Sequence, residues 1–436
     1  MNSRSFYVKS YGCQMNIYDS EKIVSILENK GMKENREIHD ADIVIFNTCN
    51  IRDKAAHKVY SDIGRVAKIS KDKTIAVVGC VAQAENLEMF NKNHHINIVL
   101  GPQSYHLLPK MISDIESNRS KLINTDFIIN EKFDYFLEER KPKGVSSAVT
   151  IQEGCDKFCS FCVVPFTRGP EYSRSINDIK FEVESMCERG AREIILLGQN
   201  VNAYNFQKNS SSYSLTKLID SISELQNIKR IRYTTSHPIN MSHELIKLHS
   251  SNKKLMPFLH LPVQSGSDAI LKKMNRKYNI NDYRKVIDKL KTTCPEIEIS
   301  SDFIIGFPGE TEKDFNETMK LVDEIQFTQS YSFIYSARPG TKSAEEEDKT
   351  PIKIKKERLS LLQEKLKNIQ LKYNNSYCNK IVNVLVENQS VNNPKYFFGK
   401  TPHMQSVYLE SENVLIGEEM KVKITSCNHK SLYGIA

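Results

Sequence analysis

The chain has 436 residues, of which 39% are hydrophobic and 26% charged, as in folded globular proteins. This length allows two or three domains with a core each. The N-terminus lacks a secretory signal, and no stretch reaches the roughly 18 apolar residues of a membrane span, so we expect a cytoplasmic protein. The net charge of +8 suits a nucleic-acid partner, but it also fits a general preference for lysine.

The first segment alternates short apolar strands with helices. We expect strands at residues 6–11, 42–48, 74–78 and 96–100, and amphipathic helices at residues 20–30 and 54–69. Near-continuous apolar strands separated by helices predict a parallel sheet that is covered on both faces. This segment therefore reads as an α/β domain.

Cys13, Cys49 and Cys80 each follow one of these strands. They are 36 and 31 residues apart, which is about the length of one βαβ unit. The carboxyl ends of parallel strands share one edge of an open sheet, where such folds bind ligands. A single cysteine of this kind is usually a small buried residue. Three in the same placement instead predict a metal centre with three cysteine ligands.

Periodicity weakens and charge accumulates before residue 144, which indicates a linker. From there we count six strand-like runs, at residues 148–151, 193–197, 231–234, 258–263, 299–305 and 331–335. Helices are expected between them, at residues 176–189, 215–225, 242–249, 283–293 and 312–325. Six βα units are too few for a closed eight-fold barrel, so they predict a partial (β/α)6 barrel whose site lies at the carboxyl ends of the strands.

Cys155, Cys159 and Cys162 have the spacing CxxxCxxC and lie in the loop after the first barrel strand. Thiolates are soft ligands that suit zinc, copper(I) or iron–sulfur clusters. Iron–sulfur clusters usually take four cysteines, and no histidine is close enough in sequence to complete a Cys3His zinc site. A [4Fe–4S] cluster held by only three cysteines leaves one iron open to a cosubstrate. A structural zinc site and an electron-carrier cluster are the alternatives.

Other loops after barrel strands contain Gly, Ser and Pro. They are at residues 197–200, 235–238, 264–267 and 306–311, and their glycines would allow a ligand to approach the backbone. Together they predict a rim for a cosubstrate and a substrate. His237 and His260 lie near this rim, and we favour a structural role for both.

The C-terminal part begins with a basic helical stretch at residues 353–372, which has seven basic and two acidic residues. It is either a solvated connector or a surface that faces phosphates. Five short β runs follow, at residues 381–386, 396–398, 406–409, 419–424 and 432–435. They predict a small OB-like barrel of the kind that binds nucleic acids.

Along nearly its whole length the chain resembles the radical S-adenosylmethionine (SAM) methylthiotransferases, and within them the MiaB branch. The spacing of Cys155, Cys159 and Cys162 is similar to the radical SAM signature. Further similar motifs are YGCQMN with Asp19-Ser20, NTC followed by IRDKA, GCVAQ, EGCDKFC, FCVVP and TRG. The tail resembles a TRAM domain, in which Lys400 replaces the usual arginine and so lacks its planar fork.

The resemblance implies domains at residues 1–120, 145–375 and 376–436 with a linker at 121–144. It also implies methylthiolation of C2 of N6-isopentenyladenosine, next to the anticodon of tRNA. Cys155, Cys159 and Cys162 would hold the [4Fe–4S] cluster that cleaves SAM to a radical. Cys13, Cys49 and Cys80 would hold an auxiliary [4Fe–4S] cluster involved in sulfur donation, and a second SAM would donate the methyl group. An electron donor such as flavodoxin or ferredoxin is implied, and we expect a monomer.

Three alternatives remain open. Sister branches of the family act on threonylcarbamoyladenosine in tRNA or on an aspartate of a ribosomal protein. A protein of another class, a non-enzymatic RNA-binding protein with zinc, would explain the tail but not the cysteine loop on a barrel. We expect the other cysteines, Cys187, Cys294, Cys378 and Cys427, to be ordinary thiols without shared placement.

Overall fold

The computed structural model describes residues 4–50, 53–70, 72–118, 120–127, 144–391, 393–411 and 414–436. The chain forms two compact units. Unit 1 consists of Met1–Lys141, Gln152–Asp156 and Cys162–Arg174, and unit 2 consists of Pro142–Ile151, Lys157–Phe161 and Ser175–Ala436. None of the described helices combines the length and apolar character that crossing a bilayer requires.

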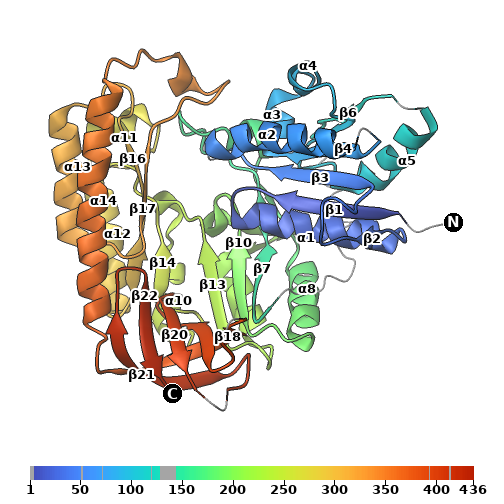
Figure 1. The fold of residues 1–436 in the computed structure, drawn as a ribbon. Helices are drawn as coiled ribbons and strands as arrows, with labels where there is room; N and C mark the ends of the chain where they lie inside the picture. The colour runs from blue at the N-terminus through green and yellow to red at the C-terminus, as the bar shows by residue number, and fades with distance from the viewer. Residues whose placement is uncertain are drawn as a thin grey trace. The chain divides into compact units, whose positions relative to one another are not determined.

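Unit 1 contains a six-stranded parallel sheet in the order β2-β1-β3-β4-β5-β6, drawn mainly in blue in Figure 1. The strands are β1 (Ser5–Ser10), β2 (Lys33–Glu34), β3 (Ile43–Thr48), β4 (Thr74–Gly79), β5 (Ile98–Leu100) and β6 (Leu122–Asn124). The helices are α1 (Gln14–Asn29), α2 (Asp53–Ile69), α3 (Cys80–Glu85), α4 (Glu88–Lys92) and α5 (Leu108–Asn118).

Helices cover both faces of this sheet, because β3 and β5 are buried along their whole length. Side chains of α1 and α5 pack with one face, and those of α2, α3 and α4 pack with the other. The parallel sheet inferred from the sequence is confirmed. Helix α1 begins six residues before the expected start, directly after Cys13. Strand β6 extends the sheet into the segment expected to be a linker, whose residues 128–143 lie outside the described ranges.

The later segments of unit 1 form a short two-stranded ladder and one helix. Strand β8 (Gln152–Glu153) pairs antiparallel with β9 (Tyr172–Ser173), and α7 (Val164–Arg168) lies between them in sequence. Neither was expected from the sequence.

Unit 2 begins with the parallel strands expected of a partial barrel. Strands β7 (Ser146–Thr150), β10 (Glu193–Leu197) and β13 (Arg230–Thr234) form one sheet, β14 (Phe258–His260) pairs with β15 (Glu298–Ser300), and β16 (Asp302–Ile305) pairs with β17 (Tyr331–Ile334). Parallel bridges from Ile231 to Leu255 and from Gln264 to Phe303 connect these groups. The expected strand at residues 299–305 is divided at Ser301.

Five helices lie close to their predicted positions. They are α8 (Ile176–Glu188), α9 (Leu215–Ser223), α10 (His243–Ser251), α12 (Ile280–Thr293) and α13 (Glu312–Ile325). The Ser175 hydroxyl caps α8 by accepting from the Asp178 amide. Helix α11 (Asp268–Lys273) and the hairpin β11 (Asn205–Lys208) and β12 (Ser211–Ser214) are additional.

The C-terminal strands close into a five-stranded barrel in the order β18-β19-β20-β22-β21. They are β18 (Ile381–Gln389), β19 (Tyr396–Lys400), β20 (Ser406–Glu410), β21 (Glu419–Cys427) and β22 (Ser431–Ile435), in orange to red in Figure 1. The long helix α14 (Ile352–Asn375) precedes them. The sequence predicts an α/β protein with a parallel-sheet domain, a partial (β/α)6 barrel and a small C-terminal β-barrel, in this order. This fold class is confirmed.

The small barrel and the partial barrel are joined by buried arginines. Arg230 donates to the carbonyl oxygen of Lys400 at 2.7 Å, and Arg232 donates to that of Thr401 at 3.0 Å. Arg232 also pairs with the buried Glu193 at 2.8 Å. The Lys400 ammonium lies 3.5 Å from Glu387. The backbone of Lys400, the residue that replaces the usual TRAM arginine, and of Thr401 therefore contacts the partial barrel.

Candidate metal centres

The three cysteines of unit 1 follow three neighbouring parallel strands. β1, β3 and β4 are adjacent in the sheet, and Cys13, Cys49 and Cys80 come at or just past their carboxyl ends. Cys13 is the N-cap residue of α1, and Cys80 is the first residue of α3. Since these strand ends share one edge, the fold gathers three sequence-distant thiols there, as their spacing indicated.

Gly12 allows Cys13 and Cys49 to approach each other. Its φ is +111°, and a Cβ on Gly12 would lie 2.2 Å from the Cβ of Cys49 and 2.6 Å from its Sγ. A hydrogen bond with Cys49 lowers the pKa of the Cys13 thiol to about 6; burial opposes this, and the charge of Arg168 adds to it. These contacts favour the thiolate form of Cys13, which is the form that binds metals.

Arg168, at the end of α7, is a buried cation at this edge. Its guanidinium donates to Asp19 at 2.6 Å and to Glu153 at 3.1 Å. It also hydrogen-bonds to Cys80. Burial raises the pKa of Cys80 above its usual value, and the charge of Arg168 offsets part of this rise. Burial disfavours the charged guanidinium, but Asp19, Cys80 and Glu153 raise the pKa of Arg168 well above its usual value. Arg168 thus stays protonated beside the thiols.

These residues fit an iron–sulfur cluster. Among the described residues, no three Cys, His, Asp or Glu side chains converge as they would on one metal ion. A cluster distributes its ligands over several iron atoms, so it does not need that convergence. The thiol donors are soft, Gly12 leaves the space between Cys13 and Cys49 without an intervening side chain, and Arg168 offsets negative charge.

Cys155 and Cys162 belong to unit 1, and a backbone hydrogen bond holds Cys155 in place. The amide of Cys155 donates to the carbonyl oxygen of Gly169 at 3.2 Å. Gly154 has φ of +76°, and a Cβ there would lie 1.8 Å from the carbonyl oxygen of Pro170. Glycine is therefore required at the position before Cys155.

Cys159 belongs to unit 2, where it has a cationic neighbour. Arg276 donates to the Cys159 sulfur at 3.5 Å, to the Pro262 carbonyl at 2.8 Å and to the Tyr278 hydroxyl at 3.1 Å. Ser160 donates to the carbonyl oxygens of Lys273 and Met274. Burial disfavours the charged guanidinium, while Tyr278 and Cys159 raise the pKa of Arg276. Arg276 and Arg168 are site residues that local sequence patterns do not reveal, because their partners are distant in sequence.

The two histidines near the predicted rim have structural partners. His237 accepts from the Ile239 amide at 3.3 Å and packs edge-on against Tyr278. Burial, followed by the charges of Arg276 and Lys157, lowers the pKa of His237 far below its usual value. His260 contacts the Ser300 hydroxyl at 3.0 Å. These contacts agree with the structural role that we favoured.

Two glycines of the predicted rim serve internal packing. A Cβ on Gly266 would lie 2.5 Å from the Cα of Thr318 in α13, and one on Gly306 would lie 2.5 Å from the Cδ of Lys355 in α14. The interpretation that these glycines allow a ligand to approach is corrected, since helices occupy that space. Thr235 and Gln264, which follow β13 and β14, have φ of +69° and +75°. Such strained backbone often marks a functional site.

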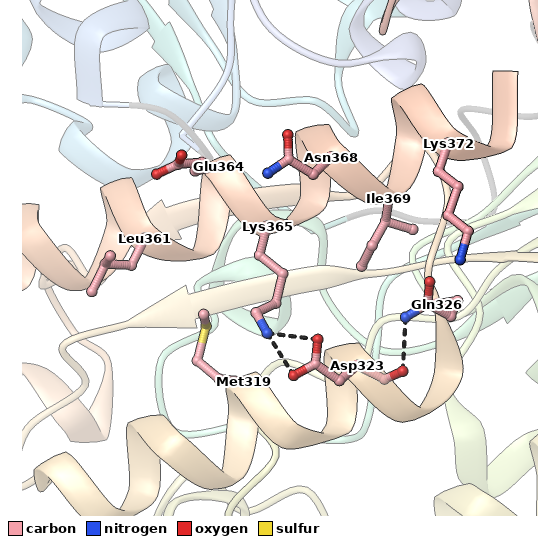
Figure 2. Close-up of a pocket in the computed structure, with 9 residues that line it drawn as sticks. All are labelled: Met319, Asp323, Gln326, Leu361, Glu364, Lys365, Asn368, Ile369 and Lys372. Atoms are coloured by element: carbon pink, nitrogen blue, oxygen red, sulfur yellow. Dashed lines mark hydrogen bonds and ion pairs between the residues drawn. The ribbon is translucent and has the colours of Figure 1, made fainter. Parts of the chain in front are cut away.

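A groove lies between α13 and α14, and its lining contains no cysteine. It has a volume of about 440 Å³, and Figure 2 shows Lys365 reaching across it to Asp323 at 2.6 Å. Lys355 and Arg358 likewise form ion pairs with Asp348 and Glu310. These pairs favour the interpretation of residues 353–372 as a connector.

The remaining cysteines differ from the expectation in one respect. Cys187 and Cys294 are buried, and burial raises the pKa of Cys187 to about 11. The sulfur atoms of Cys378 and Cys427, however, lie 3.7 Å apart. The expectation that these four share no placement is therefore wrong for this pair, because closure of the barrel brings the end of β21 next to the turn after α14.

Three family models match the chain in succession. The uncharacterized protein family UPF0004 matches residues 5–101, the radical SAM superfamily matches residues 149–322, and the TRAM domain matches residues 375–436. The fold and these matches define a radical SAM enzyme, a class that uses SAM and a [4Fe–4S] cluster. Its N-terminal α/β domain and TRAM barrel narrow the class to the methylthiotransferases.

Proteins from Rickettsia rickettsii (strain Sheila Smith) and Rickettsia canadensis (strain McKiel) are each 47% identical to this chain over 442 residues, and a protein from Rickettsia bellii (strain OSU 85-389) is 46% identical. Each match covers 99% of both chains, and each relative is named tRNA-2-methylthio-N(6)-dimethylallyladenosine synthase. The chain belongs to this MiaB-type family, whose members are enzymes that transfer sulfur-containing groups.

Solved structures with low sequence identity to this chain share its fold. The radical SAM methyltransferase TsrM from Kitasatospora setae has a TM-score of 0.57 at 13% identity, covering 78% of this chain and 75% of that one. The cobalamin-dependent radical enzyme OxsB has a TM-score of 0.52 at 11% identity, covering 84% of this chain and 56% of that one. One TsrM structure contains a [4Fe–4S] cluster.

Proposed function

We propose that this protein adds a methylthio group to C2 of N6-isopentenyladenosine, the base immediately 3′ of the anticodon in tRNA. The full-length identity of 47% to relatives named for this reaction carries the proposal. The gathering of Cys13, Cys49 and Cys80 at one sheet edge supports it. C2 of adenine offers neither an acidic proton nor a leaving group, so the reaction calls for cofactor radical chemistry rather than acid–base catalysis.

In this proposal Cys155, Cys159 and Cys162 hold the cluster that binds and cleaves SAM. Cys13, Cys49 and Cys80 hold an auxiliary [4Fe–4S] cluster. When bound, the first cluster would supply the electron that cleaves SAM to a radical, and the second would supply the sulfur. The chain's own residues tune and position them. Gly12 keeps Cys49 close to Cys13, Arg168 offsets the charge of the unit 1 thiolates, and Arg276 donates to the Cys159 sulfur.

Each of the three domains has its own role in this proposal. Residues 1–120 carry the auxiliary site, residues 121–144 link it to the radical SAM core at residues 145–375, and residues 376–436 bind RNA. The RNA partner is the anticodon stem-loop of tRNA, where unstacked loop bases are accessible to a protein. A flavodoxin or ferredoxin supplies the electrons, and the protein acts as a monomer in the cytoplasm.

Nucleoside mass spectrometry tests this function. Isopentenylated tRNA is incubated with anaerobically reconstituted protein, SAM and a reductant, and then digested to nucleosides. We expect isopentenyladenosine to gain one methylthio group, with 5′-deoxyadenosine formed alongside it. The matched control is tRNA that carries threonylcarbamoyladenosine at the same position.

Methylthiolation of the control tRNA, but not of isopentenylated tRNA, would move the enzyme to a sister branch. Zinc in place of iron, without labile sulfide, would instead indicate a non-enzymatic RNA-binding protein.

A further inference from the structure

The outer surface of the C-terminal barrel carries a row of aromatic side chains. Phe398 in β19 lies opposite Tyr408 in β20, and Tyr408 lies opposite Tyr433 in β22. The ring centroids of the first pair are 5.4 Å apart, and those of the second pair are 5.7 Å apart with planes inclined by only 18°. We call Phe398, Tyr408 and Tyr433 the aromatic row.

The barrel does not need these rings for its core. Its interior is filled by inward-facing residues of all five strands, which are Val384, Val386, Phe397, Val407, Leu409, Val422, Ile424 and Leu432. Tyr408 and Tyr433 remain 44% and 37% exposed. Residues on adjacent strands that point outward are normally polar when they face only water. Three neighbouring aromatic residues there indicate a surface that is covered by a partner.

One end of the row is open. Beyond Tyr433 the next residue across the sheet is Ser426 in β21, whose small side chain is exposed. The Asn428 side chain donates to the Tyr433 hydroxyl at 3.0 Å, which orients that ring. A flat ligand group can therefore continue the stack over Ser426. The exposed Lys423 lies on the same strand, three residues before Ser426.

We propose that the aromatic row is a stacking platform for unpaired bases of the RNA substrate. Every base has a π face, so aromatic side chains on a sheet bind single-stranded bases with little sequence preference, and nearby lysines bind phosphates. The choice of RNA as the partner rests on the proposed function. The placement of the platform on β19, β20 and β22 rests on the register and ring geometry alone.

Fluorescence anisotropy with a labelled anticodon stem-loop tests the platform. We expect Tyr408→Ala and Tyr433→Ala each to raise Kd on the order of ten-fold, because stacking on one aromatic ring contributes that much to binding. Tyr408→Phe and Tyr433→Phe keep the ring and should stay within about two-fold of the unchanged protein. The control is Val391→Ala, which changes a fully exposed apolar residue in the loop between β18 and β19.

Salt dependence separates stacking from charge. The slope of log Kd against log salt should be unchanged in Tyr408→Ala but smaller in Lys423→Ala, since only the latter removes a phosphate contact. Release of 5′-deoxyadenosine without RNA should be normal in every variant, so failure of the radical reaction would be seen separately. Unchanged RNA affinity in both alanine variants, with the thermal unfolding of the barrel preserved, would overturn the proposal and leave a protein partner for this surface.

Discussion

The guanidinium of Arg168 lies 2.6 Å from the carboxylate of Asp19 inside unit 1, although 149 residues separate them in the chain. Asp19 has no exposed surface and Arg168 is 2% exposed. The same guanidinium reaches Glu153, two residues before Cys155. This arginine therefore fixes the segment before the second cysteine motif to the N-terminal α/β fold.

Replacing Arg168 by Met should destabilise the protein by about 3–5 kcal/mol, because it removes the cation that pairs with the buried carboxylates of Asp19 and Glu153. The control is Arg65→Met, since Arg65 pairs with Asp62 but its side chain is 74% exposed. Its effect should not exceed about 1 kcal/mol. Urea unfolding of both variants measures the difference. An equal loss in the free energy of unfolding for the two variants would refute the role given to Arg168.

Gly12→Ala should prevent assembly of the auxiliary cluster, since the new methyl group would occupy the position of Cys49. In a background with Cys155, Cys159 and Cys162 changed to Ala, iron should fall from about four atoms per chain to below about one. Gly31→Ala is the control, because its φ is +80° but nothing lies within 4 Å of the added Cβ. It should cost about 1–2 kcal/mol from backbone strain alone and keep the iron. Full iron content in Gly12→Ala would contradict the arrangement.

Arg276→Met should lower the reduction potential of the cluster bound by Cys155, Cys159 and Cys162. Loss of a donated hydrogen bond leaves more negative charge on the sulfur of Cys159, which makes reduction harder. An EPR-monitored redox titration in a background with Cys13, Cys49 and Cys80 changed to Ala measures this. Arg284→Met, which breaks an exposed pair with Glu324, is the control. A potential equal to that of the control would show that Arg276 has no influence on the cluster.

His249 should make stability dependent on pH. Burial lowers the pKa of His249 to about 4, and its ring accepts or donates a hydrogen bond with Tyr233. Between pH 6.5 and 4 the unfolded chain takes up a proton that the folded chain does not, so stability present above pH 6.5 is lost as the pH falls. The loss is about 2 kcal/mol at pH 5. His249→Gln should remove this part of the pH dependence in urea unfolding, whereas the exposed His94→Gln should retain it.

Cys378 and Cys427 should form an intramolecular disulfide when the protein is treated with oxidised glutathione. The two protein thiols reduce glutathione disulfide to two glutathione thiols, and the linked peptides lose roughly 2 Da. The Cys378→Ser variant cannot form this bond. Its Cys427 should instead carry a mixed disulfide with glutathione or remain a free thiol. Recovery of only free thiols from the unchanged protein would contradict the 3.7 Å separation of the sulfur atoms.

Much of this architecture follows from local sequence patterns. Strands β3 and β10 are buried throughout, and their ends agree with the prediction to within one residue. A strand that is covered on both faces is apolar along its whole length, which makes it easy to recognise in a sequence. The placement of Cys13, Cys49 and Cys80 followed from the same strands. Arg168 and Arg276 were missed because their partners come from distant segments. The prediction is wrong for Gly266 and Gly306, because a sequence does not show whether a helix or a ligand fills the space beside a glycine.

One experiment tests most directly whether the two cysteine sets have different roles, one in SAM cleavage and the other in methylthiolation. Product nucleoside and 5′-deoxyadenosine are quantified together for the unchanged protein, for Cys155/Cys159/Cys162→Ala and for Cys13/Cys49/Cys80→Ala, each with isopentenylated tRNA. We predict both products from the unchanged protein, neither from the first variant, and 5′-deoxyadenosine without methylthiolation from the second. Methylthiolated nucleoside from either triple variant would contradict the account.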